Sequence, residues 1–145
     1  MDDIALMREI GRLQEQINAL RTIQQGWQPV FLATPLVSTS YDGDDTVNVG
    51  AYTIDTSAVF SAPAGIKAAA IYFRATWASA SNTSLMTIRT TGTDVATIVA
   101  SIRAQTTYNQ DGFCIIPCDT NGDFVLTVYG ANATNVILRM SAYWK

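Results

Sequence analysis

Residues 3–25 read DIALMREIGRLQEQINALRTIQQ, and this stretch decides how the rest of the chain is organised. Leucine and isoleucine recur in it at alternating spacings of four and three residues, at Leu6, Ile10, Leu13, Ile17 and Leu20. Such a 3.5-residue repeat is typical of a coiled-coil seam, with isoleucine at heptad position a and leucine at position d. Asp2 and Asp3 suit a helix N-terminus, and Gly26 suits a helix end.

One helix cannot bury this seam alone, so we expect residues 1–26 to form an oligomerisation and attachment helix that packs against copies of the same chain. The alternative is an amphipathic helix that packs on its own domain. About three heptads are marginally stable in isolation, so the domain that follows must help to hold an oligomer together.

Residues 27–145 differ abruptly in composition and are rich in Thr, Ser, Ala, Val, Ile and Tyr. Turn residues recur about every 8 to 12 positions, which is typical of an all-β sandwich or barrel. We therefore predict a mainly β protein, in which the helix is followed by an eight-stranded antiparallel β-sandwich of jelly-roll type. The expected strands are 28–37, 46–54, 66–77, 84–91, 95–104, 112–117, 124–130 and 135–144.

Apolar and polar residues alternate in three of these strands, which predicts one buried and one solvated face. The expected core residues are Ile71, Phe73, Ala75 and Trp77, then Ala96, Ile98, Ala100 and Ile102, and finally Val136, Leu138, Met140 and Ala142. Cys114 and Cys118 are expected to be buried free thiols, because the chain offers no further cysteine or histidine for a metal site.

Composition argues against several classes of function. Charged residues make up 14% of the chain and the net charge is −3, which does not suit a nucleic-acid partner. The sequence has no run of 18 apolar residues and no signal-peptide pattern, so we expect neither membrane insertion nor conventional secretion. The absence of histidine excludes Ser-His-Asp catalysis and histidine-ligated zinc, and we expect no cofactor and no metal.

Alternating strand direction divides the connections between two ends of the sandwich. Loops 38–45, 78–83, 105–111 and 131–134 are expected at the end far from the helix, and loops 55–65, 92–94 and 119–123 at the near end. Loops on a rigid scaffold commonly carry recognition residues, and the far set is the more polar. The candidate receptor-binding residues are Tyr41, Asp42, Asp44, Asp45, Asn82, Tyr108, Asn109 and Asn132, with Asn135 beside them.

Two acidic turns resemble cation sites. Residues 119–123 begin like a calcium loop, but Phe124 and Gly130 occupy the positions that need glycine and glutamate, so a tight hairpin turn is the better interpretation. Residues 42–45 could bind a cation or a sugar hydroxyl, and a solvated turn is the alternative. No aspartates are marked as an opposed catalytic pair, so we do not expect an enzyme.

Aromatic residues could stack on a sugar ring. The candidates are Tyr41, Tyr52, Tyr108 and Trp77, of which Trp77 is better explained as a core residue.

The order of parts is a short helix, the joint QQGWQP (24–29) and a Thr/Ser-rich β domain. This order, with the segments SAPAGIKAAAIYFRATW (61–77) and TNVILRMSAYWK (134–145), resembles the distal part of a bacteriophage tail fibre or related virion fibre. The resemblance implies a homotrimer in the virion, with its N-terminus on other virion proteins and its head on a host surface glycan or protein. The isoleucine and leucine positions by themselves favour two strands, so a dimer stays open. Alternative functions are a free-standing lectin-like module or a small polysaccharide depolymerase.

Overall fold

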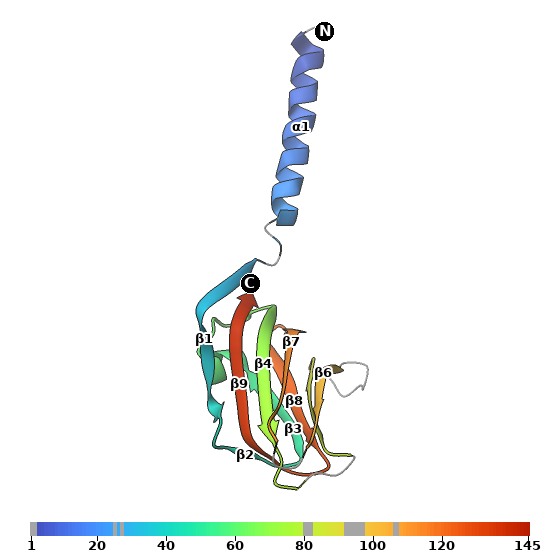
Figure 1. Cartoon of the computed structure of the whole chain (residues 1–145). Coiled ribbons are helices and arrows are strands. Elements are labelled where there is room, and N and C mark those ends of the chain that lie inside the picture. The colour runs from blue at the N-terminus through green and yellow to red at the C-terminus, as the bar shows by residue number, and fades with distance from the viewer. Residues whose placement is uncertain (1–2, 25, 27, 80–82, 92–97, 106–107) are drawn as a thin grey trace.

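The structure, a computed structural model, describes residues 3–24, 26, 28–79, 83–91, 98–105 and 108–145. Helix α1 (Asp3–Gln24) extends away from a two-sheet head (Figure 1). The seam side chains of Leu6, Ile10, Leu13 and Ile17 are 44–50% exposed, so α1 does not bury them on its own domain. The side chain of Leu20, the fifth seam residue, lies outside the described part of the structure.

The head is built from two antiparallel sheets. The strands of sheet A lie in the order β1 (Pro29–Asp42), β9 (Ala133–Trp144), β4 (Ala68–Thr76) and β7 (Gln110–Pro117). The short strand β2 (Thr46–Val47) also pairs with β9. The strands of sheet B lie in the order β3 (Gly50–Asp55), β8 (Asp123–Tyr129), β5 (Leu85–Arg89) and β6 (Ile98–Arg103). A mainly β protein is thus confirmed.

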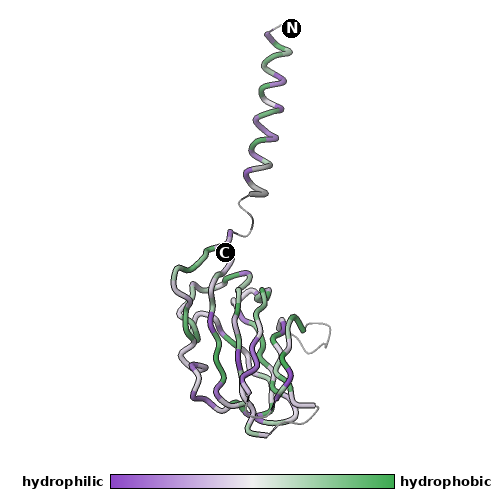
Figure 2. The backbone as a smooth tube through the Cα atoms, viewed as in Figure 1, coloured by the Kyte–Doolittle hydropathy of each residue, from purple (hydrophilic) through white to green (hydrophobic). Residues whose placement is uncertain are grey.

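The core lies between the two sheets, and Figure 2 shows apolar residues alternating along their strands. Seven predicted core residues in β4, directly after β4 and in β9 are buried in the core: Ile71, Phe73, Ala75, Trp77, Val136, Leu138 and Met140. The prediction that Ala142 faces the core is wrong: Ala142 is buried, but a register shift after Met140 aligns it with Ala70 on the outer side of the sheet. The prediction for Ile98 is wrong, because this side chain is 36% exposed, and Ala100 is only partly buried, whereas Ile102 is buried. A register shift in the pairing with β5 aligns Ile98 with the outward-facing Arg89, so the alternation breaks there. Ala96 lies outside the described residues.

Several strand boundaries differ from the expected ones. The first strand continues to Asp42, through the segment expected to turn. Its pairing with β9 shifts register between Val37 and Asp42, and there the hydroxyl of Ser38 accepts hydrogen bonds from the N–H groups of Ser40 and Tyr41. The expected strand 46–54 is interrupted after Val47 and gives β2 and β3.

The expected loop 55–65 contains a short helix, α2 (Thr56–Phe60). The carboxylate of Asp55 caps it by accepting hydrogen bonds from the N–H groups of Ser57 and Ala58. Phe60 is buried, and the hydroxyl of Thr56 donates to the carbonyl of Gly122 at 2.8 Å. The helix also packs beside β1, where the hydroxyl of Thr39 donates to the carbonyl of Val59.

Replacing Asp55 by alanine is expected to cost about 1 kcal/mol of unfolding free energy at neutral pH, because the cap of α2 is lost. The hydrogen bond from the Ser57 hydroxyl, followed by the backbone N–H groups of Ala58 and Ser57, lowers the pKa of Asp55 below its usual value. A lowered folded-state pKa gives stability that is present above the unfolded pKa and is lost as pH falls through the folded pKa. Urea unfolding should therefore show a difference at pH 7 that shrinks in acid; Asp55→Asn, which can still cap, should lose less.

The two ends of the head are defined by hydrogen bonds between loops. Near α1, Gln28 and Lys145 exchange two backbone hydrogen bonds of 3.3 Å, and the N–H of Lys67 donates to Trp144 at 2.8 Å. At the opposite end, the N–H of Ala104 donates to Ser84 at 3.0 Å, and the hydroxyl of Thr134 donates to the carbonyl of Thr76. The described parts of the loops thus lie at the ends predicted by strand alternation; residues 92–94 are not described.

Residues 119–123 form the predicted tight turn, with Gly122 at a φ of +90° and the N–H of Asp119 donating to the carbonyl of Asp123 at 3.0 Å. The predicted hairpin is wrong, because the flanking strands β7 and β8 belong to different sheets. A carboxylate oxygen of Asp119 already accepts the N–H groups of Asn121 and Asp123, which explains the acidic turn without a cation.

Both cysteines are free thiols, as predicted, although only Cys114 is fully buried and Cys118 follows the end of β7. Burial raises the pKa of Cys114 to about 11. Burial, followed by the negative charges of Asp119 and Asp123, raises the pKa of Cys118 to about 12. Both groups are therefore protonated and weakly nucleophilic at neutral pH.

Replacing Gly130 by alanine is expected to destabilise the head by about 2 kcal/mol or more. Gly130 follows β8 at a φ of +78°, and an added Cβ would lie 2.8 Å from backbone atoms of Ser84. Gly65 has a similar φ of +67°, but its nearest neighbour would be 3.7 Å away, so Gly65→Ala is a matched control for backbone strain without the clash. Thermal unfolding of both variants should show the larger loss at Gly130; equal losses would exclude the clash as the cause.

Candidate functional site

A pocket of about 240 Å³ lies at the far end of the head, where β1 ends and β2 and β3 begin. Two half-buried aromatic rings, Tyr41 and Tyr52, line it together with polar groups. The full set of lining residues is Ser40, Tyr41, Asp45, Thr46, Val47, Asn48 and Tyr52. Two aromatic rings beside a few polar groups are the usual composition of a small-ligand pocket.

The local sequence builds this pocket from both sides. On the β1 side, the Ser38 hydrogen bonds turn the strand so that Tyr41 packs partly against the core. Gly43 then turns the chain at a φ of +121°, and the N–H of Asp42 donates to a carboxylate oxygen of Asp45 at 3.4 Å. On the β3 side, the hydroxyl of Tyr52 donates to the carbonyl of Asn48 at 3.0 Å.

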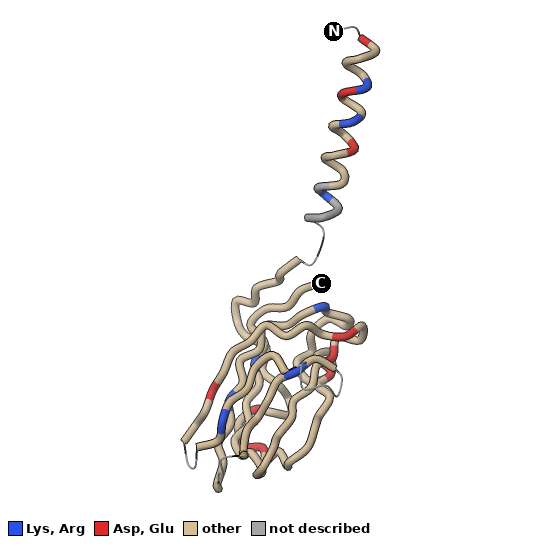
Figure 3. The backbone as a smooth tube through the Cα atoms, turned by 90° about the vertical axis from the view of Figure 1, so that its right-hand side faces the viewer, with Lys and Arg blue, Asp and Glu red and all other residues tan. Residues whose placement is uncertain are grey.

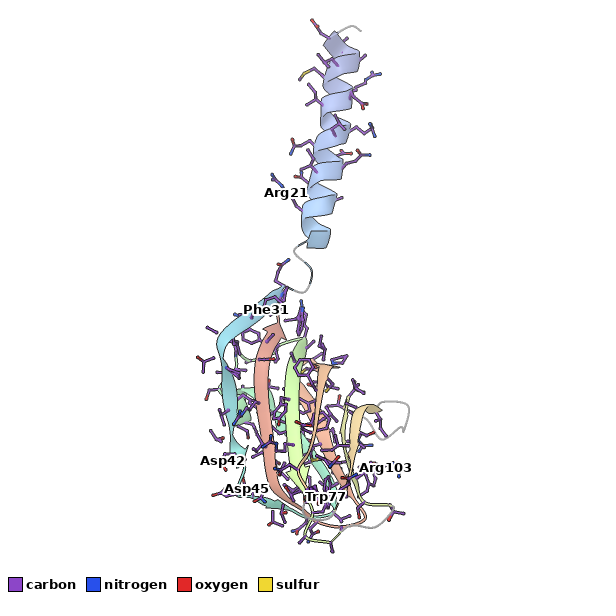
Figure 4. The ribbon with its side chains drawn as sticks, viewed as in Figure 1. Arg21, Phe31, Asp42, Asp45, Trp77 and Arg103 are labelled. Carbon is purple, nitrogen blue, oxygen red and sulfur yellow. The ribbon has the colours of Figure 1, made fainter. Side chains whose placement is uncertain are left out.

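Three carboxylates gather beside this pocket. Carboxylate oxygens of Asp42, Asp44 and Asp45 lie within 4.8 Å of one another, and Figure 4 labels Asp42 and Asp45 at the far end. Hydrogen bonding to Asp42, followed by the negative charges of Asp42 and Asp45, raises the pKa of Asp44. Burial raises the pKa of Tyr41, with smaller contributions from Tyr52 and Asp45.

These carboxylates are the one group within the described residues whose oxygens are close enough to share a cation. Asp42 and Asp44 are exposed, however, and exposed acidic groups commonly occur without an ion. A solvated turn therefore explains the cluster equally well. Figure 3 shows that charged residues are otherwise scattered over the head, with long uncharged stretches between them.

The other predicted contact residues do not join this pocket. The side chain of Asn132 accepts a hydrogen bond from the N–H of Val49 at 3.0 Å and so fixes the segment after β2. The side-chain oxygen of Asn109 accepts the hydroxyl of Thr76 at 2.6 Å. Asn109 and the exposed Tyr108 precede β7, at the opposite edge of sheet A from β1. Asn82 lies outside the described residues, and Asn135 lies within β9 at a φ of +49°.

Asn48 and Thr46 line the pocket but were not predicted as site residues, because a continuous strand was expected over residues 46–54. The signal for the interruption was present: Asn48 and Gly50 stand two residues apart, and Gly50 adopts a φ of +154°. Such residues mark breaks in strands.

A second, wider pocket of about 520 Å³ lies at the near end, beside the turn that follows β7. Its lining includes Lys67 and Asp119. Close by, burial and the negative charges of Asp119 and Asp55 raise the pKa of Asp123. The sequence predicted no site at this end.

No family model matches the chain, and no curated protein is similar to it. Among the described residues, no helix is both long enough and apolar enough to span a bilayer.

Proposed function

We propose that this protein is a structural and adhesive fibre protein, in which α1 joins copies of the chain and the far ends of the heads contact a surface. One observation carries the proposal: a half-exposed seam of isoleucine and leucine on a 22-residue helix that stands clear of its own head. A single helix of this length is marginal in water, so it needs a partner that buries the seam. A second copy supplies the same heptads in register.

We propose three copies. The seam is compatible with two or three helices, and the resemblance to virion fibres favours three. In the same proposal the N-terminus attaches to other virion proteins, and the protein is located in the virion.

We also infer that the head is a jelly roll. Every connection between the longer strands passes from one sheet to the other, except the connection from β5 to β6. First and last strands, β1 and β9, are neighbours in sheet A, while β3 and β8 are neighbours in sheet B. Such nested antiparallel pairs support a jelly roll, an architecture common in capsid and lectin domains.

The proposed ligand at the far end is a host surface glycan. The rings of Tyr41 and Tyr52 can pack on the apolar face of a sugar, while Asp45 and Asn48 can bind its hydroxyl groups. A host surface protein is the other candidate for this end. We propose no catalytic role, because the raised pKa of Asp44 comes from neighbouring carboxylates in an exposed turn rather than from burial.

The pocket also favours a second candidate function, a free-standing lectin-like module whose helix serves only to raise its valency. The two candidates differ in location. A fibre protein should co-purify with virus particles through its N-terminus, whereas a free-standing module should bind glycans without any particle.

Glycan-array binding by the full chain tests the contact site. We expect Asp45→Ala and Asn48→Ala to weaken binding at least tenfold, because each removes a polar group from the pocket. Thr53→Ala, an exposed change on sheet B, is the matched control and should leave binding unchanged. Loss of binding in Tyr108→Ala alone would move the contact to the other edge of sheet A. Unchanged binding in all these variants would exclude the far end as the contact site.

A further inference from the structure

We propose that the outward face of sheet A is the surface on which the heads of neighbouring copies pack, so that its occupant is a second copy of this chain. The inference rests on the proposed function, because it requires α1 to bring copies together. It assigns a second interface, in the head, that the helix seam alone does not require.

The surface in question is an apolar face formed by side chains from all four long strands of sheet A. Pairing registers align Phe31 with Ala142, Ala142 with Ala70, and Ala70 with Ile115, so one row crosses the whole sheet. Directly paired residues point to the same side of a sheet. We call this surface, with its larger side chains, the apolar face of sheet A: Phe31, Val37, Tyr72, Phe113, Ile115 and Trp144. The same registers place one exposed charged residue, Arg139, on this face between Val37 and Tyr72.

Four of these six side chains are unusually exposed for their size, while Tyr72 and Trp144 are partly buried. Phe31 is 78% exposed and Phe113 is 60% exposed, while Val37 and Ile115 are about half exposed. In an antiparallel sandwich the outer face of a sheet normally carries polar residues. Several large apolar side chains together on one face mark an interaction surface.

Large apolar side chains are less exposed on the strands of sheet B, where Val99 is 43% exposed and Tyr129 is 37% exposed. The corresponding row across its outer face pairs Ala51, Thr127, Thr87 and Ser101, all small and mostly polar. The large apolar side chains of sheet A are thus the more exposed, which favours sheet A over sheet B as the interface.

The position of the apolar face points to a copy of the chain as its occupant. Strand β1 leads directly from the helix segment, and Phe31 lies at the end of the head nearest to α1 (Figure 4). Parallel helices in a bundle would hold the near ends of the heads together at a high effective concentration. The exposed seam of α1 and the apolar face then form two neighbouring surfaces that the same copies can bury.

Charge on the flanking row supports the same occupant. Next to the apolar face, pairing aligns Arg74 with both Asp111 and Ile137, and Ile137 with Asp42. The row therefore carries both signs of charge. A surface with both signs can meet a rotated copy of itself without like-charge repulsion.

Introducing a charge on the apolar face in the full chain tests the inference by sedimentation equilibrium. Ile115→Lys on β7 is expected to raise the dissociation constant of the oligomer at least tenfold. Ser101→Lys on β6 is the matched control, since it places the same charge on an exposed edge-strand residue of sheet B, and it should leave the constant unchanged. Circular dichroism checks that both variants fold.

A second probe keeps the surface apolar, so it does not depend on how the lysine variant folds. The photo-crosslinking residue p-benzoylphenylalanine is introduced in place of Phe113, and in a separate protein in place of Ser101. We expect crosslinks between copies from position 113 and none from position 101. An oligomeric chain with no crosslinks from position 113, and an unchanged dissociation constant in Ile115→Lys, would overturn the inference and leave the proposed function standing. A monomeric wild-type chain would overturn both.

Discussion

Replacing Ile10 and Ile17 together by asparagine is expected to dissociate the oligomer and to melt α1. Each isoleucine occupies position a of the seam, where it would be buried against copies of itself. A buried amide without a hydrogen-bond partner costs about 1–3 kcal/mol, and every copy in the bundle would carry two of them. One asparagine at such a position is tolerated in longer coiled coils, but about three heptads leave little stability to lose.

The matched control places asparagine at two solvent-facing positions with the same spacing, in Arg8→Asn with Glu15→Asn. Sedimentation velocity and far-UV circular dichroism measure association and helix content. The seam variant should lose both, and the control should lose neither. A seam variant with the mass and helix content of the wild-type chain would show that this stripe is not the interface.

Replacing Trp77 by alanine should produce the largest loss of head stability, about 3–5 kcal/mol. Trp77 directly follows β4, is completely buried, and lies at the far end of the head (Figure 4). A loss of this size is a large part of the 5–15 kcal/mol that typically stabilises a domain. Urea unfolding followed by circular dichroism should show a much lower midpoint.

Trp77→Phe separates packing from hydrogen bonding at this position. Among the described residues, the indole N–H of Trp77 has no hydrogen-bond acceptor, so a phenyl ring removes no hydrogen bond. We therefore expect less than half of the loss seen with alanine. Equal losses in the two variants would show that the volume of the ring is not what stabilises the core.

Alternation predicted the core best in the central strands of sheet A. β9 and β4 each have a neighbour on both sides, and between their register shifts they pair residue by residue over Ile71–Arg74, where Phe73 and Leu138 face the core. β6 has only one partner, and its register shift turned Ile98 outward. The same reasoning failed in β9 at Ala142, where a register shift after Met140 aligns this residue with Ala70 on the outer face of sheet A.

Turns were harder to predict, because hydrogen bonds from single side chains decided them. Ser38 accepts local N–H groups at the register shift through which β1 continues past the expected turn, and Asp55 caps a helix inside an expected loop. Neither interaction changes the apolar pattern. The Asp55 cap was still visible in principle, since aspartate before Thr-Ser is a common helix start.

Only the part of the candidate site that lies within one short segment of the sequence was predictable. Tyr41 and Asp45 are neighbours in sequence, so they had to lie together whatever the fold. Tyr52 and Asn48 join them only because β3 begins where β1 ends. The alternation of apolar and polar residues does not reveal the order of strands in a sheet. In the structure this order places Tyr108 at the opposite edge of sheet A from Tyr41, so the two do not share a site.

The mass of the full chain in solution tests the central claim most directly. Light scattering over a range of concentrations should give three times the chain mass of 15.7 kDa. A mass of two chains would keep the seam but contradict the trimer. A mass of one chain at every concentration would contradict the fibre proposal as a whole.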